Sequence, residues 1–256
     1  MSKLVWDQVG EKTYETGTKK GVLYLIDKTT KEYSKGVAWN GLTAVSENPS
    51  GAEATALWAD DIKYLNLYST ETFGATVEAY TYPDEFAECD GSAEIAPGVM
   101  AGQQSRKAFG MSYRTNVGSD ADADLGYKLH LIYGATASPS EKAYTTVNDS
   151  PEAITFSWEA TTTPILIDGL IKPVAELEID STVATASKLK VLEAALYGAE
   201  EFSATSTYAV GDIVEYSNKI YQCTTAISTA AAWDAAKWNK VSDTVVPYLP
   251  LPSEVK

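Results

Sequence analysis

The stretch VAELEID, residues 174–180, alternates apolar and acidic side chains with the two-residue period of a β-strand. We therefore expect one face of this strand to pack on a core and the other to meet water. The apolar face carries Ala175, Leu177 and Ile179, and the acidic face carries Glu176, Glu178 and Asp180.

Six other runs are rich in Val, Ile, Thr and aromatic residues: VLYLID, GVAWNGLTAVS, GATVEAYTY, KAFGMSYRTNV, YKLHLIYGATA and AITFSWEATTT. Short strands of this kind, broken by turn residues, favour a β-sandwich or barrel. Two helices are expected beside them. YPDEFAECDG predicts a short helix stopped by Gly91, and ASKLKVLEAALYG predicts an amphipathic helix that ends at Gly198. The predicted fold class is mainly β.

Composition limits the possible functions of this 256-residue chain. Its formal charge of -15 repels phosphate backbones, which argues against a protein that grips nucleic acid. No apolar run approaches the about 20 residues of a membrane helix, so no membrane partner is expected. The start, MSKLVWDQVG, lacks a signal-peptide pattern, which predicts synthesis and assembly in a cytoplasm. Cys89 and Cys223 are expected to be free thiols.

The segment ENPSGAEATALWADDIKY, residues 47–64, combines the loop residues Pro49 and Gly51 with large apolar side chains. A free surface loop does not normally keep such side chains. We therefore predict a long arm that packs on a neighbouring subunit. Its candidate contact residues are Glu47, Leu57, Trp58, Asp60, Asp61 and Ile62.

STYAVGDIVEYSNKIYQCTTA, residues 206–226, predicts a β-hairpin whose turn contains Ser217 and Asn218. A lone hairpin is only marginally stable in water, so other apolar side chains must cover it. The expected core of this small module consists of Tyr208, Tyr216, Tyr221, Trp233 and Trp238. Short polar connections on either side suggest an autonomous unit at residues 202–243.

Catalytic motifs are weak throughout the sequence. His130 lies in a strand-like run without a nucleophile or metal-ligand partner, which favours a structural histidine. GTKKG, residues 17–21, lacks the spacing of a phosphate-binding loop and is interpreted as a basic turn. SDADADLG, residues 119–126, lacks the Gly and Glu of an EF-hand loop, which favours a solvated hairpin tip. A glycosidase pair among the carboxylates cannot be assigned from sequence. No enzyme activity, metal or cofactor is predicted.

Several long stretches resemble the major tail tube proteins of bacteriophages with long non-contractile tails, the siphophages. They are WNGLTAVSENPSGAEATALWADDIKYLNLYSTETFGATVEAYTYPDEFAECDG, GQQSRKAFGMSYRT, GYKLHLIYGATASPSEKAYTTVNDSPEAITFSWEATTTPI, LKVLEAALYG and YLPLPSEVK. The resemblance implies a β-sandwich or barrel protomer with a long inter-subunit loop, which assembles in the host cytoplasm. It also implies stacked rings, hexameric by expectation, in the virion tail. The implied partners are further copies of the chain, the tape measure, tail terminator and distal tail proteins, and DNA that passes through the lumen without specific binding.

The module resembles small carbohydrate-binding modules found on chitinases and on phage virion proteins. The matching residues are Tyr208, Gly211, Asp212, Val214, Tyr216, Tyr221, Trp233 and Trp238. Chitin-binding members carry an exposed aromatic pair where this chain has TTAIS, residues 224–228, so at most weak glycan contact is expected. Because the resemblance to tail tubes resumes after the module, we predict a tube domain at 1–201, closed by 244–256, with the module inserted at 202–243.

Two alternatives stay open at this stage. The chain could instead be a carbohydrate-binding surface adhesin that uses the module, although this accounts only for the last quarter of the sequence. The acidic face of Glu176, Glu178 and Asp180 could line the tube lumen, where it would repel DNA, or could be an outward solvated face.

Overall fold

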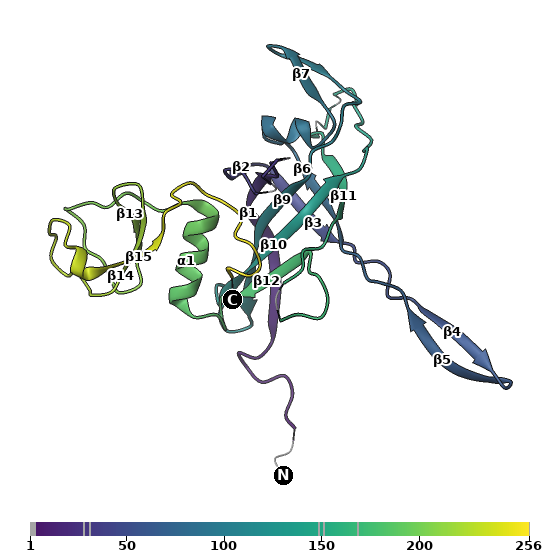
Figure 1. Ribbon diagram of the computed structural model, residues 1–256, viewed down its shortest axis with the longest axis horizontal. Coiled ribbons are helices and arrows are strands. Elements are labelled where there is room, and N and C mark those ends of the chain that lie inside the picture. The colour runs from purple at the N-terminus through teal and green to yellow at the C-terminus, as the bar shows by residue number, and fades with distance from the viewer. Residues whose placement is uncertain are drawn as a thin grey trace. The chain divides into compact units, whose positions relative to one another are not determined.

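The computed structural model describes residues 4–27, 29–30, 32–147, 149–150, 152–167 and 169–255. Over these residues the chain is mainly β, with one α-helix and two short 3-10 helices (Figure 1). The predicted fold class, a mainly-β chain with a small β module, is confirmed. The chain divides into two compact units, one of residues 1–39, 110–131 and 177–256 and the other of residues 40–109 and 132–176.

The largest sheet has eight strands in the order β2-β1-β9-β10-β11-β6-β3, and β12 pairs with β10. All seven strand-like runs identified in the sequence contribute to it. Its strands are β1 (Thr13–Leu25), β2 (Val37–Trp39), β3 (Leu42–Glu47), β6 (Gly74–Ala79), β9 (Phe109–Ser119), β10 (Gly126–Ala137), β11 (Phe156–Thr162) and β12 (Glu176–Asp180). The structure confirms part of the alternation predicted for VAELEID. On its apolar face Ala175 is buried, but Leu177 and Ile179 are only half-buried.

Helix α1 (Ala186–Tyr197) packs within the first unit through the leucines that its spacing predicted. Leu189, Leu192 and Leu196 are its buried residues, and the helix ends at Gly198, whose φ of 88° suits glycine. The hydroxyl of the buried Tyr24 donates to the backbone oxygen of Leu196 at 2.9 Å. This bond satisfies a carbonyl in the last turn of the helix, where intrahelical donors run out.

The predicted basic turn at GTKKG is wrong, because residues 17–21 lie inside strand β1. Gly17 has a φ of 68° and Lys20 a φ of 54°, so the strand contains two residues outside the β region. Local composition suggested a turn, but the chain continues as strand β1, which neighbours β9 on one side and pairs with β2 at Gly21–Leu23 on the other.

The second unit has an aromatic core around the short helix η1 (Asp84–Glu88). Phe86, the buried residue of η1, meets Trp158 edge-on at a ring-centroid distance of 5.0 Å and Phe109 at 5.5 Å. The predicted short helix before Gly91 is thus confirmed as a 3-10 turn. Its role is to bring one phenyl ring to the sheet.

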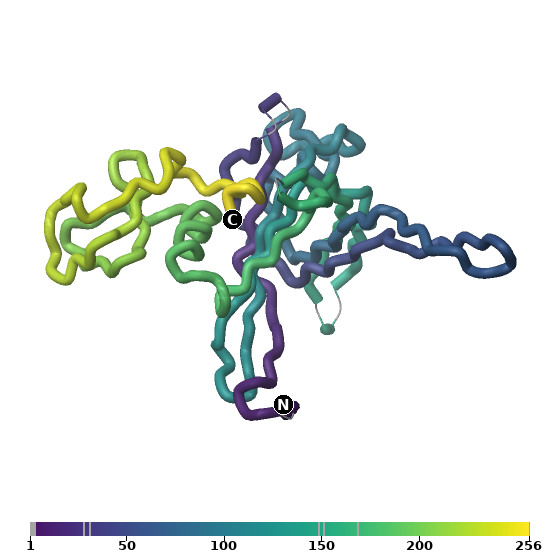
Figure 2. The backbone as a smooth tube through the Cα atoms, turned by 60° about the horizontal axis from the view of Figure 1, so that its bottom comes forward, coloured from purple at the N-terminus to yellow at the C-terminus, as the bar shows by residue number. Residues whose placement is uncertain are grey.

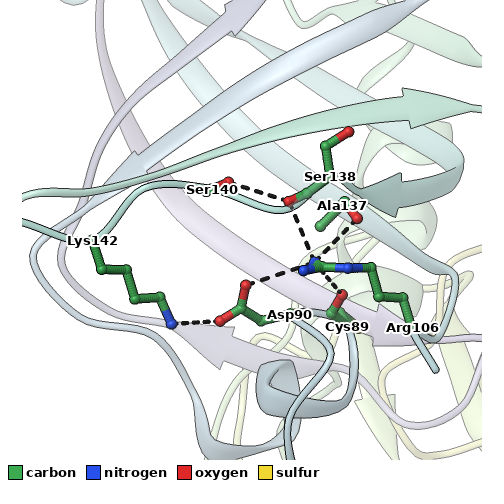
Figure 3. Close-up of polar contacts among 7 residues, drawn as sticks. All are labelled: Cys89, Asp90, Arg106, Ala137, Ser138, Ser140 and Lys142. Carbon is green, nitrogen blue, oxygen red and sulfur yellow. Dashed lines mark hydrogen bonds and ion pairs between the residues drawn. The ribbon is translucent and has the colours of Figure 1, made fainter. Parts of the chain in front are cut away.

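A polar cluster, formed by Asp90, Arg106 and Lys142, joins three segments of the second unit. Figure 3 shows Arg106 Nη1 donating to the backbone oxygens of Cys89, Ala137 and Ser138 at 3.2–3.4 Å, while Lys142 pairs with Asp90. The Asp90 side chain is largely buried, so pairing with cations offsets its desolvation. The cluster holds the base of a hairpin, β7 (Ala93–Ala96) and β8 (Val99–Ala101), that the sequence did not reveal.

Both cysteines are free, as the sequence predicted, and the structure shows that both are buried. Cys89 is 0% exposed and Cys223 is 2% exposed. Burial raises the pKa of the Cys89 thiol to about 12, because the low-polarity surroundings disfavour the thiolate. The thiolate is the reactive form, so both thiols should be inert in the folded chain.

We predict that neither thiol of the native protein reacts with a thiol-specific disulfide reagent at about pH 8, near the ordinary thiol pKa. Addition of denaturant should release both thiols, measured by absorbance of the leaving group. The variant Cys223→Ser should release one fewer. Rapid labelling of the native protein would contradict this account of burial.

Candidate functional sites: an exposed hairpin and an aromatic module

The predicted arm at residues 47–64 is mostly a β-hairpin rather than a loop. It consists of β4 (Ala54–Ala59) and β5 (Ile62–Tyr68), which pair antiparallel. Asp60 and Asp61 form the turn with φ values of 51° and 63°, the pair of positive φ values that a type I′ hairpin turn requires. Glu47 lies at the end of β3 instead. Figure 2 shows this part of the second unit as a narrow two-stranded ribbon.

The root of the hairpin is fixed by paired hydrogen bonds. The backbone groups of Ser50 and Thr72 bond each other at 2.8 Å and 2.7 Å, and their hydroxyls meet at 2.8 Å. A Cβ at Gly51 would lie 2.3 Å from the backbone oxygen of Thr70, so only glycine allows the two strands to approach here. The ribbon therefore leaves the sheet along a defined path.

Both faces of the hairpin expose apolar side chains. Cross-strand partners share a face, so Leu57 and Leu65 lie together on one side, while Ala54 and Tyr68 lie together on the other. Trp58 is 69% exposed and Leu57 is 41% exposed. The other large exposed residues are Ile62, Tyr64, Leu65, Leu67 and Tyr68. An apolar ribbon exposed on two sides is typical of a protein–protein contact, because two strands alone are barely stable in water.

The candidate acidic residues of β12 are partly paired within the first unit. Glu178 forms an ion pair with Lys128 at 2.9 Å, and Lys128 also pairs with Glu15. Hydrogen bonds from Thr182 hold the pKa of Asp180 below its usual range. Glu176 is half-buried. Because Lys128 offsets the charge of Glu178, this strand presents less net negative charge than its sequence suggests.

The acidic loop matches its sequence interpretation, and His130 occupies the buried strand position that the sequence favoured. His130 is buried in β10, stacks on Tyr113 at a centroid distance of 4.5 Å and shares a hydrogen bond with Thr115. Residues 120–125 connect β9 to β10, and Ser119 Oγ accepts from the backbone amides of Ala121 and Asp122.

The small module is a three-stranded sheet in the order β13-β14-β15, within the first unit. Strands β13 (Ile213–Glu215) and β14 (Ile220–Cys223) form the predicted hairpin, and Ser217 and Asn218 have φ values of 51° and 58°. The sequence missed the third strand, β15 (Trp238–Ser242), which follows the short helix η2 (Ala235–Lys237). It pairs with β14 and brings Trp238 opposite Cys223.

Of the five predicted aromatic residues, Trp238 lies in the core of the module and Tyr208, Tyr221 and Trp233 pack against it, whereas Tyr216 lies outside the core cluster and stacks on Trp233. Trp238 is 7% exposed and packs with Val214, Cys223 and Ile227. Trp233 stacks on both Tyr216, at 3.9 Å between ring centroids, and Trp238, at 5.1 Å. Phe202, which the sequence analysis did not include, meets all three stacked rings edge-on and stacks on Tyr208. Its position just before the hairpin gave no periodic signal that could have identified it.

Polar contacts attach the module to α1. Lys190 donates to Asp212 at 2.7 Å, and Gln222 donates to the hydroxyl of Ser187 at 2.8 Å. Burial opposes ionisation of Asp212, but the hydrogen bond and charge of Lys190 and the hydrogen bond from the backbone amide of Ala209 together outweigh burial, so the pKa of this carboxyl is lowered. Its contribution is therefore present above the ordinary carboxyl pKa and is lost as pH falls through the lowered value. Exposed ion pairs of this kind typically contribute at most about 1 kcal/mol.

Comparison with protein-family models gives a match for one region of the chain, the small module. Residues 201–242 match the model of carbohydrate-binding module family 5/12. A search of curated proteins returns no match. One solved structure with similarity is a chain in the cryo-EM structure of the anti-feeding prophage (AFP) baseplate, 6-fold symmetrised. It is 6% identical, covers 72% of this chain and 100% of that chain, and has a TM-score of 0.33, at which the similarity supports no statement about fold or function.

Residues 224–228 contain no aromatic side chain that could stack on a sugar. Thr224, Thr225 and Ala226 are exposed, and Ile227 is buried. Among the residues that the structure describes, no helix has the length and apolar character needed to cross a bilayer.

Proposed function

We propose that this protein is a structural virion protein, the major tail tube subunit of a siphophage, and that it has no catalytic role. The observation that carries the proposal is the β4–β5 hairpin, which exposes large apolar side chains on both faces. Contact with another subunit would bury these apolar side chains, which are otherwise in water. The long sequence resemblance to tail tube proteins, which includes this hairpin, indicates that the cover is a second copy.

In this proposal the subunits form stacked rings, hexameric by analogy with the resembled family. A contact between two different surfaces of identical subunits generates rings when the rotation closes. The rings would surround the tape measure protein, end at the terminator and distal tail proteins, and later conduct DNA. The formal charge of -15 suits a wall along which DNA slides without binding. Glu176, Glu178 and Asp180 remain candidate lumen residues.

We predict that the double variant Leu57→Ala, Trp58→Ala stays folded but fails to assemble. Both side chains are exposed in the protomer, so their loss costs little folding stability, whereas truncating interface anchors typically costs about 2 kcal/mol or more each. Negative-stain microscopy of the purified protein measures the outcome as rings or tubes against monomers. Val210→Ala, an exposed apolar residue of the module, is the matched control. Equal polymerisation of the double variant and the parent would show that the hairpin is not an assembly element.

We also predict that residues 202–243 are a dispensable decoration of the tube. Two side-chain contacts that join the module to α1 are polar, those of Lys190 with Asp212 and of Ser187 with Gln222, and both partners on α1 can be hydrated when the module is removed. Replacing the module with a short Gly/Ser linker should preserve tubes and reduce only their outer diameter. Trp238→Ala should unfold the module alone. Aggregation or a permanently monomeric deletion variant would place the module in the assembly interface.

The match of residues 201–242 to a carbohydrate-binding family favours a second candidate function, glycan binding by the module. Residues 201–242 contain three lysines as well as acidic residues. Because neither sign of charge dominates, a neutral polysaccharide is the expected ligand. The parent chain should be depleted from solution by suspended cellulose or chitin, and the module-deleted variant should not be. Equal depletion of the two proteins would remove this candidate without affecting the tube proposal.

A further inference from the structure

Glycan binding by the module requires a ring that can lie flat against a sugar, and most of its rings cannot. Trp238 is buried. Trp233 is stacked on Tyr216 and Trp238 and is met edge-on by Phe202 and Tyr221. The Tyr208 hydroxyl is bonded to the backbone of Ser203, and its ring contacts Phe202 and Trp238. These rings hold the module together.

Tyr216 differs because the other half-buried rings, Phe202, Tyr208, Tyr221 and Trp233, pack against the buried core of the module and Tyr216 does not. It ends the stack that runs from Trp238 through Trp233. One face lies on Trp233 at a centroid distance of 3.9 Å and an interplanar angle of 10°, and Phe202 contacts it edge-on. The residue is half-buried, so part of its surface stays in solvent. Its backbone closes the hairpin turn, with Tyr216 N–H donating to the Lys219 oxygen at 2.8 Å. Trp233 therefore supports one face of the Tyr216 ring, and the turn hydrogen bond fixes the Tyr216 backbone, so the ring is preorganised for stacking.

The turn places polar side chains beside this ring. Ser217 and Asn218 are exposed, and their left-handed backbone conformation keeps them at the tip of the hairpin. A hydroxyl and a carboxamide supply hydrogen-bond donors and acceptors that match sugar hydroxyls. Lys219, the next residue, pairs with Asp243 at 3.8 Å, so its charge is partly offset.

We propose that Tyr216 is a single-ring stacking platform for a β-1,4-linked hexopyranose chain, with Ser217 and Asn218 bonding the hydroxyls at the edge of the stacked sugar. The proposal rests on the glycan-binding candidate function and names its contact residues. A β-1,4-linked hexopyranose of the gluco series holds its substituents equatorial, so one face of each ring presents only C–H groups and fits an aromatic face. The hydroxyls then project sideways, toward the side chains of the turn. This arrangement supplies a platform in a module whose residues 224–228 offer none.

The test uses the full chain, with cellohexaose and chitohexaose as probes and tryptophan fluorescence as the signal, since Trp233 contacts Tyr216 directly. Tyr216→Leu should weaken binding about tenfold, as expected for the loss of one aromatic stacking contact. Tyr216→Phe should stay within about threefold of the parent. Asn218→Gly, which removes the carboxamide but suits the positive φ, should weaken binding severalfold. Near-ultraviolet circular dichroism checks that each module is folded.

Tyr221→Leu is the matched control. Tyr221 also touches Trp233, but it pairs in register with Val214 on the core face of the sheet, so its replacement should leave the affinity unchanged. If Tyr216→Leu and Asn218→Gly bind like the parent, or if Tyr221→Leu alone loses binding, the platform is elsewhere and glycan binding itself stands. A parent chain that binds neither sugar overturns this proposal and the glycan-binding function together. The tube proposal is judged separately by microscopy of the same preparations.

Discussion

The main sheet depends on β10, which pairs with β9, β11 and β12. Leu129, Leu131 and Tyr133 of this strand are essentially without solvent contact. A strand in this position must have its backbone groups satisfied by its neighbours, because an unpaired buried amide costs as much as a lost hydrogen bond. The same constraint explains why the buried His130 shares a hydrogen bond with Thr115 and stacks on Tyr113. The polar residue is tolerated there because partners are built around it.

The second unit contrasts two kinds of hairpin. The base of β7–β8 is held by the cluster of Asp90, Arg106 and Lys142, so side chains distant in sequence fix its position. The β4–β5 hairpin has hydrogen bonds between its own strands and at its root, but its apolar side chains remain exposed. Folding of this hairpin therefore satisfies its backbone hydrogen bonds but leaves its apolar side chains exposed to solvent. The proposed assembly role of the hairpin rests on this imbalance.

The module shows how a segment of about forty residues can fold inside a larger chain. Its core consists mainly of aromatic rings, which bury large areas with few ordered torsions. Both ends of the segment join the first unit, and attachment at two points restricts the unfolded chain. Its contacts with α1 through Asp212 and Gln222 are polar.

The sequence by itself determined the elements whose signals are local. The strand runs, the helix that ends at Gly198 and the turn at Ser217 and Asn218 follow from side-chain period and turn chemistry, and all three are present. Only the tertiary structure decided that residues 17–21 continue a strand, that the arm is a hairpin, and that Glu178 pairs with Lys128. It also decided that Phe202 joins the aromatic stack and that Tyr216 ends it. Except for the β4–β5 hairpin, whose strands are adjacent in sequence, these features depend on contacts between segments separated along the chain, and periodicity within one segment carries no information about its partner.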